Sequence, residues 1–196
     1  MNTKQNKALV TTRTSPRRDS FTFSEEICPL QMSDQSELQL LVAAAEAVLP
    51  ADPWDSDKRF ATWSESVPDD DFDVESAAKY LESEGKPVER ALLDAYSDPK
   101  SNPIALRRIG KVGPWIKPLS KMPGDCGGFE DLRKTGDYAG IITFTTPAIS
   151  EDGFSAFLEV WTESGSHLNM GMWYWVLLRR SENEWIPSWK CMHAMS

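Results

Sequence analysis

The last third of the chain, residues 140–196, constrains the fold most, because its hydrophobic pattern is typical of strands. Asp152-Gly153 is a strong hairpin turn, since glycine tolerates a positive φ, and SENE marks a second tight turn. Four segments rich in β-branched and aromatic residues are separated by these and other turn signals: GIITFTTPAIS, FSAFLEVWTESG, MWYWVLLRR and EWIPSWKCMHAM. The pattern predicts a four-stranded antiparallel β-meander over residues 140–196.

Residues 33–97 have the apolar spacing of helices. A first helix is predicted in SDQSELQLLVAAAEAVL, whose first residues fit a capping box. A second is predicted in DVESAAKYLESEG, capped by Asp73 and closed by Gly85. A third is predicted in KPVERALLDAYSD, with Pro87 in its first turn. We therefore expect about three N-terminal helices.

These elements predict an α+β protein in which the helices pack on one face of the four-stranded antiparallel C-terminal meander. Residues 25–196 are expected to form a single domain, in which residues 98–139 are loop-rich. Residues 1–24 are basic and aperiodic, which is typical of a disordered tail. The acidic segment 51–72 is long for a loop, so it either wraps the core with its aromatic residues or is functional.

Composition excludes several function classes. The net charge of −9 and the pI of about 4.8 argue against a nucleic-acid partner, which needs a positive face. No stretch approaches the roughly 18 apolar residues of a membrane span, and the first residues lack the apolar core of an export signal. Three cysteines lie far apart without a CxxC pair, so we expect reduced thiols and a cytoplasmic protein without a membrane partner.

Cofactor and metal motifs are missing or incomplete, and we expect neither group. The glycine-rich segments fit neither a phosphate loop nor a dinucleotide site. Cys191, His193 and Met195 share one strand face, as in copper sites, but such a site needs another imidazole, and only His167 is available. Cys126 lies in a glycine-rich turn, where it is either an activated thiol or an ordinary turn residue.

Both faces of the strand predicted at residues 172–180 are apolar, so both are expected to be covered. Tryptophan crowding on a meander indicates core packing, and we expect Trp175 in the core. The alternative is a ligand or partner surface. Its candidate binding residues are Trp161, His167, Trp173, Cys191 and His193.

Three residues are weak candidates for catalysis: Glu159, His167 and His193. Glu159 is the strongest of them. It lies mid-strand between aromatic residues, so covering that face would desolvate its carboxyl group, as suits a general acid. The alternative is an ion pair across the sheet with Arg179 or Lys190.

Residues 140–189 carry a further pattern. TTPAISEDGFSAFLEV is followed by a hairpin loop, by an apolar strand ending in two arginines, and by WIP. This order resembles the C-terminal β-meander of a group of uncharacterised bacterial proteins, a domain of unknown function. The loop ESGSHLNMG departs from them, because it has no cysteine where they tend to carry a pair. The resemblance implies a fold element and a bacterial source, but no reaction.

The sequence favours a non-catalytic module that binds a protein partner or a small ligand. By analogy with other small acidic proteins, one such module would be a protein that neutralises a basic partner. The alternative is a small hydrolase-type enzyme using Glu159 with His167 or His193. What separates the two is that the sequence offers no recognisable set of acid, base and nucleophile.

Overall fold

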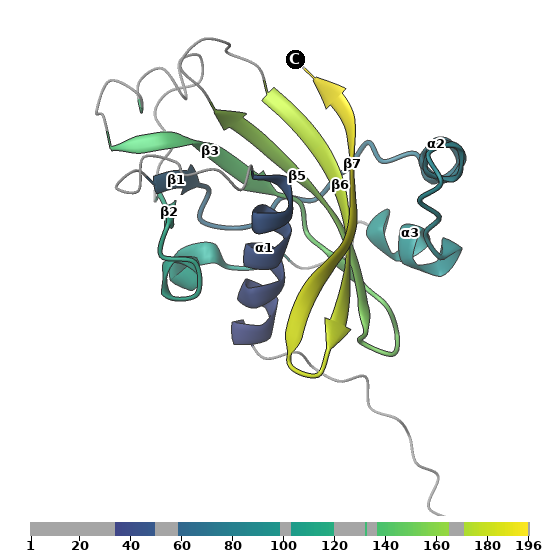
Figure 1. Cartoon of the computed structure of the whole chain (residues 1–196), viewed down its shortest axis with the longest axis horizontal. Helices are drawn as coiled ribbons and strands as arrows, with labels where there is room; N and C mark the ends of the chain where they lie inside the picture. Colours follow the sequence, from purple (N-terminus) through teal and green to yellow (C-terminus); the bar gives the residue numbers. More distant parts are fainter. Residues whose placement is uncertain are drawn as a thin grey trace, which may run out of the picture.

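The structure is a computed structural model of the whole chain, and it describes residues 34–49, 59–98, 103–119, 132, 137–164 and 171–195 (Figure 1). The predicted tail at residues 1–24, His167 and Cys126 lie outside these ranges.

A mixed seven-stranded sheet forms the centre of the described part of the molecule, in the order β2-β1-β3-β5-β6-β7, with β4 paired to β5 beside β3. The strand β1 is parallel to both of its neighbours, whereas all other pairs are antiparallel. The strands are β1 (Arg59–Thr62), β2 (Ile116–Pro118), β3 (Tyr138–Phe144), β4 (Ala148–Ile149), β5 (Ser155–Ser164), β6 (Gly171–Ser181) and β7 (Glu184–Met195).

The prediction of a four-stranded antiparallel meander is therefore wrong, although the α+β class is retained. The strands β1 and β2, of four and three residues, were not recognised because they are too short to show an alternating pattern. They lie in segments assigned to the helical and loop-rich parts of the chain. Their parallel pairing joins segments far apart in sequence, which local periodicity does not report.

The helices are α1 (Asp34–Val48), α2 (Val74–Ser83), α3 (Arg90–Tyr96) and the 3₁₀ helix η1 (Leu106–Lys111). The predicted ends of α2 are confirmed. The Asp73 carboxylate accepts hydrogen bonds from the backbone N–H groups of Glu75 and Ser76. Gly85 follows the helix with a φ of 67°. Pro87 precedes α3 rather than lying in its first turn.

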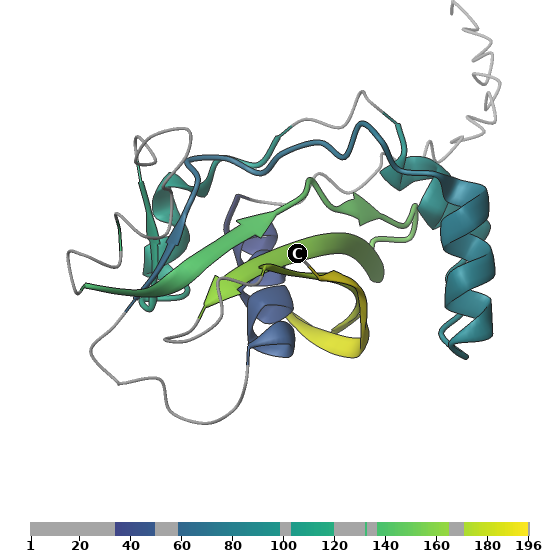
Figure 2. The same ribbon diagram turned by 90° about the horizontal axis from the view of Figure 1, so that it is seen from above.

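The helices cover both faces of the sheet, so the prediction that they share one face is also wrong. Figure 1 shows α1 on one side of β6 and β7, with α2 and α3 on the other, and Figure 2 shows the same separation from above. The two apolar faces of β6 explain this arrangement, because each needs its own cover. Within the described ranges, no helix combines the length and apolarity needed to cross a membrane.

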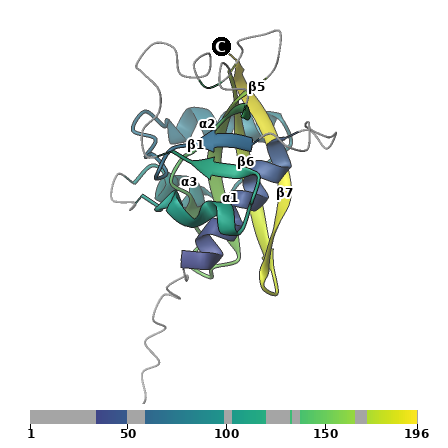
Figure 3. The same cartoon turned by 90° about the vertical axis from the view of Figure 1, so that its left-hand side faces the viewer.

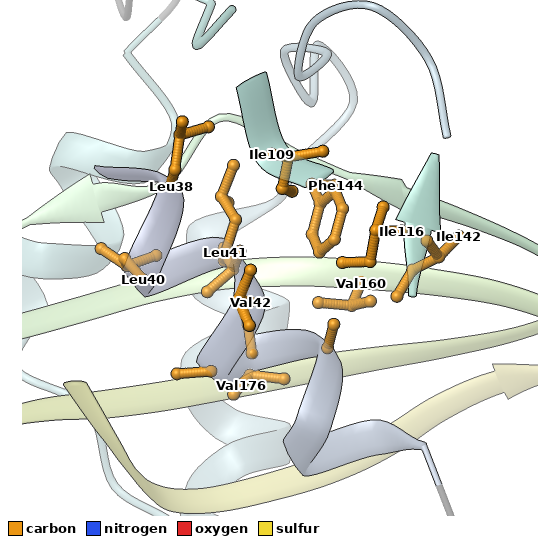
Figure 4. Close-up of a cluster of buried hydrophobic side chains, with 14 of the residues drawn as sticks. Leu38, Leu40, Leu41, Val42, Ile109, Ile116, Ile142, Phe144, Val160 and Val176 are labelled. Carbon is orange, nitrogen blue, oxygen red and sulfur yellow. The ribbon is translucent and has the colours of Figure 1, made fainter. Parts of the chain in front are cut away.

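The first core lies between α1 and one face of the sheet. Figure 4 shows Leu41 and Val42 of α1 facing Val160 and Val176 of the central strands, with Phe144 of β3 beside them. Leu41, Phe144, Val160 and Val176 are fully buried.

The second core lies on the opposite face, between the sheet and the α2–α3 pair, which is behind the sheet in Figure 3. Leu81 of α2 and Leu93 of α3 pack there with Phe157 and Trp175. Trp175 is only 9% exposed, which confirms the prediction that it belongs to the core.

Candidate functional site

The site is built at a break in the sheet beside β5. Strands β3 and β4 both pair with β5, but β3 ends at Phe144 and β4 begins at Ala148. Thr145 fills the gap with its side chain. Its hydroxyl accepts the N–H of Glu159 at 2.8 Å and donates to the Glu159 carbonyl at 3.1 Å. The break therefore fixes the backbone of Glu159 without a regular ladder.

The segment that follows β1 crosses the sheet at the same break. Val67 donates its N–H to the Phe144 carbonyl and accepts the N–H of Thr146. The hydroxyls of Ser66 and Thr146 are 3.0 Å apart in a buried hydrogen bond. These contacts anchor the acidic segment that continues through Asp69 into the cap of α2.

Asp69 is brought close to Glu159 by this path. The buried Tyr96 hydroxyl donates to Thr145 Oγ1 at 2.8 Å and lies 3.3 Å from Asp69 Oδ2. Burial raises the pKa of the Asp69 carboxyl group, and the nearby charge of Glu159 raises it further. Burial also raises the pKa of the Tyr96 phenol, so this group stays protonated as a donor.

Glu159 and His193 form a close pair, with 2.6 Å between Oε2 and Nε2. Both side chains are mostly buried, at 14% and 17% exposure. The His193 ring also stacks on Trp175, with 4.0 Å between ring centroids and 13° between ring planes. The imidazole is thus held by one polar and one aromatic contact.

A β-bulge in β7 explains the position of His193. Trp173 lies opposite Ala194 and Tyr174 opposite Met192, so His193 is the extra residue without a partner across the ladder. A bulge redirects side chains locally. Here three consecutive residues, His193, Ala194 and Met195, line the same pocket.

The pocket lies between the sheet, at strands β5, β6 and β7, and α2 with the segment that precedes it. Its volume of about 760 Å³ is within the usual size range of small-molecule sites. Its lining combines carboxylates with aromatic side chains. The residues that line it are Asp69, Asp71, Phe72, Asp73, Ser76, Ala77, Tyr80, Glu159, Trp173, Trp175, His193, Ala194 and Met195.

Some of the predicted site residues meet here and others do not. Glu159, His193 and Trp173 line the pocket. Trp161 packs against Trp173, with ring centroids 5.9 Å apart, but is not part of the lining. Cys191 is buried in the second core, and His167 lies outside the described residues.

The expected ion pair of Glu159 with Arg179 or Lys190 does not form. Arg179 donates instead to the Ser155 hydroxyl at 2.9 Å. The Lys190 ammonium lies 5.8 Å from the centre of the Tyr174 ring. Neither cation therefore neutralises Glu159.

The aspartates of the pocket were not predicted as site residues. Asp69 and Asp71 belong to the acidic segment 51–72, which was predicted either to wrap the core or to be functional, and Asp73 was predicted only as the cap of α2. Phe72 within this segment was the available signal. An aromatic residue among carboxylates indicates that the segment packs on the domain, and its ring centroid lies 6.0 Å from that of Trp175.

Among the described residues, no group of three or more His, Cys, Asp and Glu side chains is arranged to hold a metal ion. Comparisons with protein-family models, with curated proteins and with solved structures found no match for this chain.

Proposed function

We propose that this protein is a non-catalytic binding module whose pocket between α2 and strands β5 to β7 takes a small ligand or a side chain of a protein partner. The observation that carries the proposal is the pocket itself, a concavity of about 760 Å³ with aromatic and ionisable side chains converging on it. Pockets that combine apolar walls with a few placed polar groups are the usual form of ligand sites.

The proposal is tested by filling the pocket. Ser76 of α2 is exposed and lines the pocket, so Ser76→Trp should block it without disturbing the core. Glu82→Trp, on the exposed side of the same helix and outside the lining, is the matched control. Ligand-observed NMR with a fragment library should give hits that bind the parent and Glu82→Trp but not Ser76→Trp. Hits that bind all three proteins equally would place the binding site elsewhere.

The alternative is a hydrolase-type enzyme in which the Glu159–His193 pair acts as a general base. The contact of 2.6 Å between the two side chains supports it, because a carboxylate can orient an imidazole for proton transfer. The only hydroxyl group of a serine in the described lining belongs to Ser76, and it already donates to Asp73.

A panel of chromogenic esters and amides distinguishes the two functions. Turnover that Glu159→Gln and His193→Gln both abolish, but Glu163→Gln retains, would favour the enzyme. Glu163 is a suitable control because it lies on the same strand outside the lining. Ligand binding without turnover of any substrate would favour the binding module.

A further inference from the structure

We propose that the pocket recognises an organic cation, namely the alkylammonium group of a small molecule. The inference rests on the proposed function and specifies the chemistry of its ligand. It is carried by the charge of the lining, the aromatic surfaces beside it and the size of the cavity.

The charge of the lining is negative in either state of the histidine. Carboxylates come from Asp69, Asp71, Asp73 and Glu159, whereas His193 is the only basic residue that lines the pocket in the described part of the chain. Protonated His193 would offset one carboxylate, that of Glu159, at 2.6 Å. A cation would therefore be attracted and an anion repelled.

The carboxylates differ in how free they are to meet a ligand. Asp73 already accepts three hydrogen bonds as the cap of α2 and supplies charge only. Asp69 and Glu159 lie deeper and repel each other, and the pKa of the Asp69 carboxyl group is raised by burial and by this repulsion. A cation bound between them would relieve the repulsion, which is a gain that a neutral ligand does not provide.

The aromatic residues of the lining supply faces that attract cations. The electron-rich faces of tryptophan and tyrosine bind alkylammonium groups, which gain further when water is excluded. Trp175 has one face covered by the His193 ring at 4.0 Å. Tyr80, 38% exposed, and the half-buried Trp173 have surface left for a ligand.

Size and donor geometry favour an organic cation over a metal ion. The volume of about 760 Å³ is far larger than a bare metal ion requires. The described residues also hold no cluster of ligating side chains suited to a metal. A lining that combines carboxylates with aromatic rings instead suits a charged nitrogen bearing alkyl groups.

The test compares choline with 3,3-dimethyl-1-butanol, an uncharged molecule of the same shape. The affinity of the full chain for each molecule is measured by isothermal titration calorimetry and by tryptophan fluorescence. We expect choline to bind about tenfold or more tightly than the neutral molecule. Asp69→Asn and Glu159→Gln should each bring the two affinities closer together, and Trp173→Leu should weaken choline more than the neutral molecule. Glu151→Gln, in an exposed turn outside the lining, should change neither.

Each outcome separates this inference from the proposed function. Equal affinities for choline and its neutral analogue, or no binding of choline, would overturn the cation assignment, while the fragment screen with Ser76→Trp still decides whether the pocket binds ligands. N-acetyl-lysine methylamide is the third arm. If it bound more tightly than choline, the small-molecule source would be overturned in favour of a lysine side chain of a polypeptide.

Discussion

At the residue scale, the position of Asp69 disfavours its charged form, because its carboxyl group is half-buried and lies close to the carboxylate of Glu159. A raised pKa means that folding favours the protonated form. The stabilising effect of protonation is complete below the ordinary pKa of 3.8 and is lost as the pH rises through the higher pKa of the folded protein. At neutral pH the charged Asp69 therefore opposes folding.

We expect Asp69→Asn to stabilise the protein at pH 7, by less than about 1 kcal/mol because solvent screens a half-exposed group. The Tyr96 hydroxyl donates its proton to Thr145, so the amide N–H of the new asparagine can donate to the Tyr96 oxygen at this position. The gain should vanish below about pH 4, where the parent carboxyl group is protonated. Urea unfolding of both proteins between pH 3.5 and 8 measures it.

Asp152 is the control of opposite sign, because the pKa of its carboxyl group is lowered by hydrogen bonds from the Ser150 hydroxyl and the Phe154 N–H. Its charged form favours folding, so Asp152→Asn should lose stability at neutral pH and recover as the pH falls through the lowered pKa. A loss of stability at pH 7 in Asp69→Asn would show that the carboxylate makes favourable contacts that outweigh burial and repulsion.

At the scale of elements, Thr145 bridges the gap between β3 and β4 with its hydroxyl group and with its backbone N–H, which donates to the Glu159 carbonyl at 3.0 Å. Thr145 Oγ1 accepts from the Glu159 N–H and the Tyr96 hydroxyl and donates to the Glu159 carbonyl, so its hydrogen-bonding capacity is fully used. The hydroxyl thus joins Glu159 of strand β5 to Tyr96 of helix α3.

Thr145→Val should cost about 2–4 kcal/mol of unfolding free energy, because it leaves the Glu159 N–H buried without a partner and removes the acceptor of the Tyr96 hydroxyl. Thr145→Ser keeps the hydroxyl and should cost much less. Chemical denaturation of the two variants is the measurement. Equal losses in both would show that the methyl group, and not the hydrogen bonds, stabilises the break.

Local signals explain which elements the sequence predicts. The caps of α2 and the turn at Asp152-Gly153 were predicted because each depends on a few adjacent residues, and Gly153 indeed has a φ of 72°. The strands β1 and β2 and the bulge at His193 depend instead on partners distant in sequence. Of the residues that line the pocket, Glu159, His193 and Trp173 are predicted from the sequence as candidate site residues. Asp69 is not, because only the crossing segment brings it to the sheet.

At the scale of the whole molecule, one part of the sheet pairs strands that are neighbours in sequence, and the other part pairs strands that are far apart in sequence. Strands β5, β6 and β7 follow one another along the chain and are antiparallel. The pairs of β1 with β2 and β3 join remote segments, and β2 is an edge strand of three residues. Short edge strands hold few hydrogen bonds and little buried surface, so they open at low free-energy cost.

We therefore expect hydrogen exchange to be slowest in the centre of β6, around Val176 to Leu178, which is buried between both cores. Among the strands, β2 should exchange first. Hydrogen–deuterium exchange followed by mass spectrometry compares the two within one sample. Equal protection of β2 and β6 would mean that the sheet opens only as a single unit.

The strand β7 ends the sheet, and its outward backbone groups would ordinarily invite another strand to add to it. Two of its carbonyls already have partners in the α2 region: Lys86 Nζ donates to the Lys190 carbonyl at 2.6 Å, and the Tyr80 hydroxyl lies 3.4 Å from the Met192 carbonyl. A second chain that extended the sheet along this stretch would have to displace both side chains. The helix that lines the pocket thus also hinders self-association through this part of the edge.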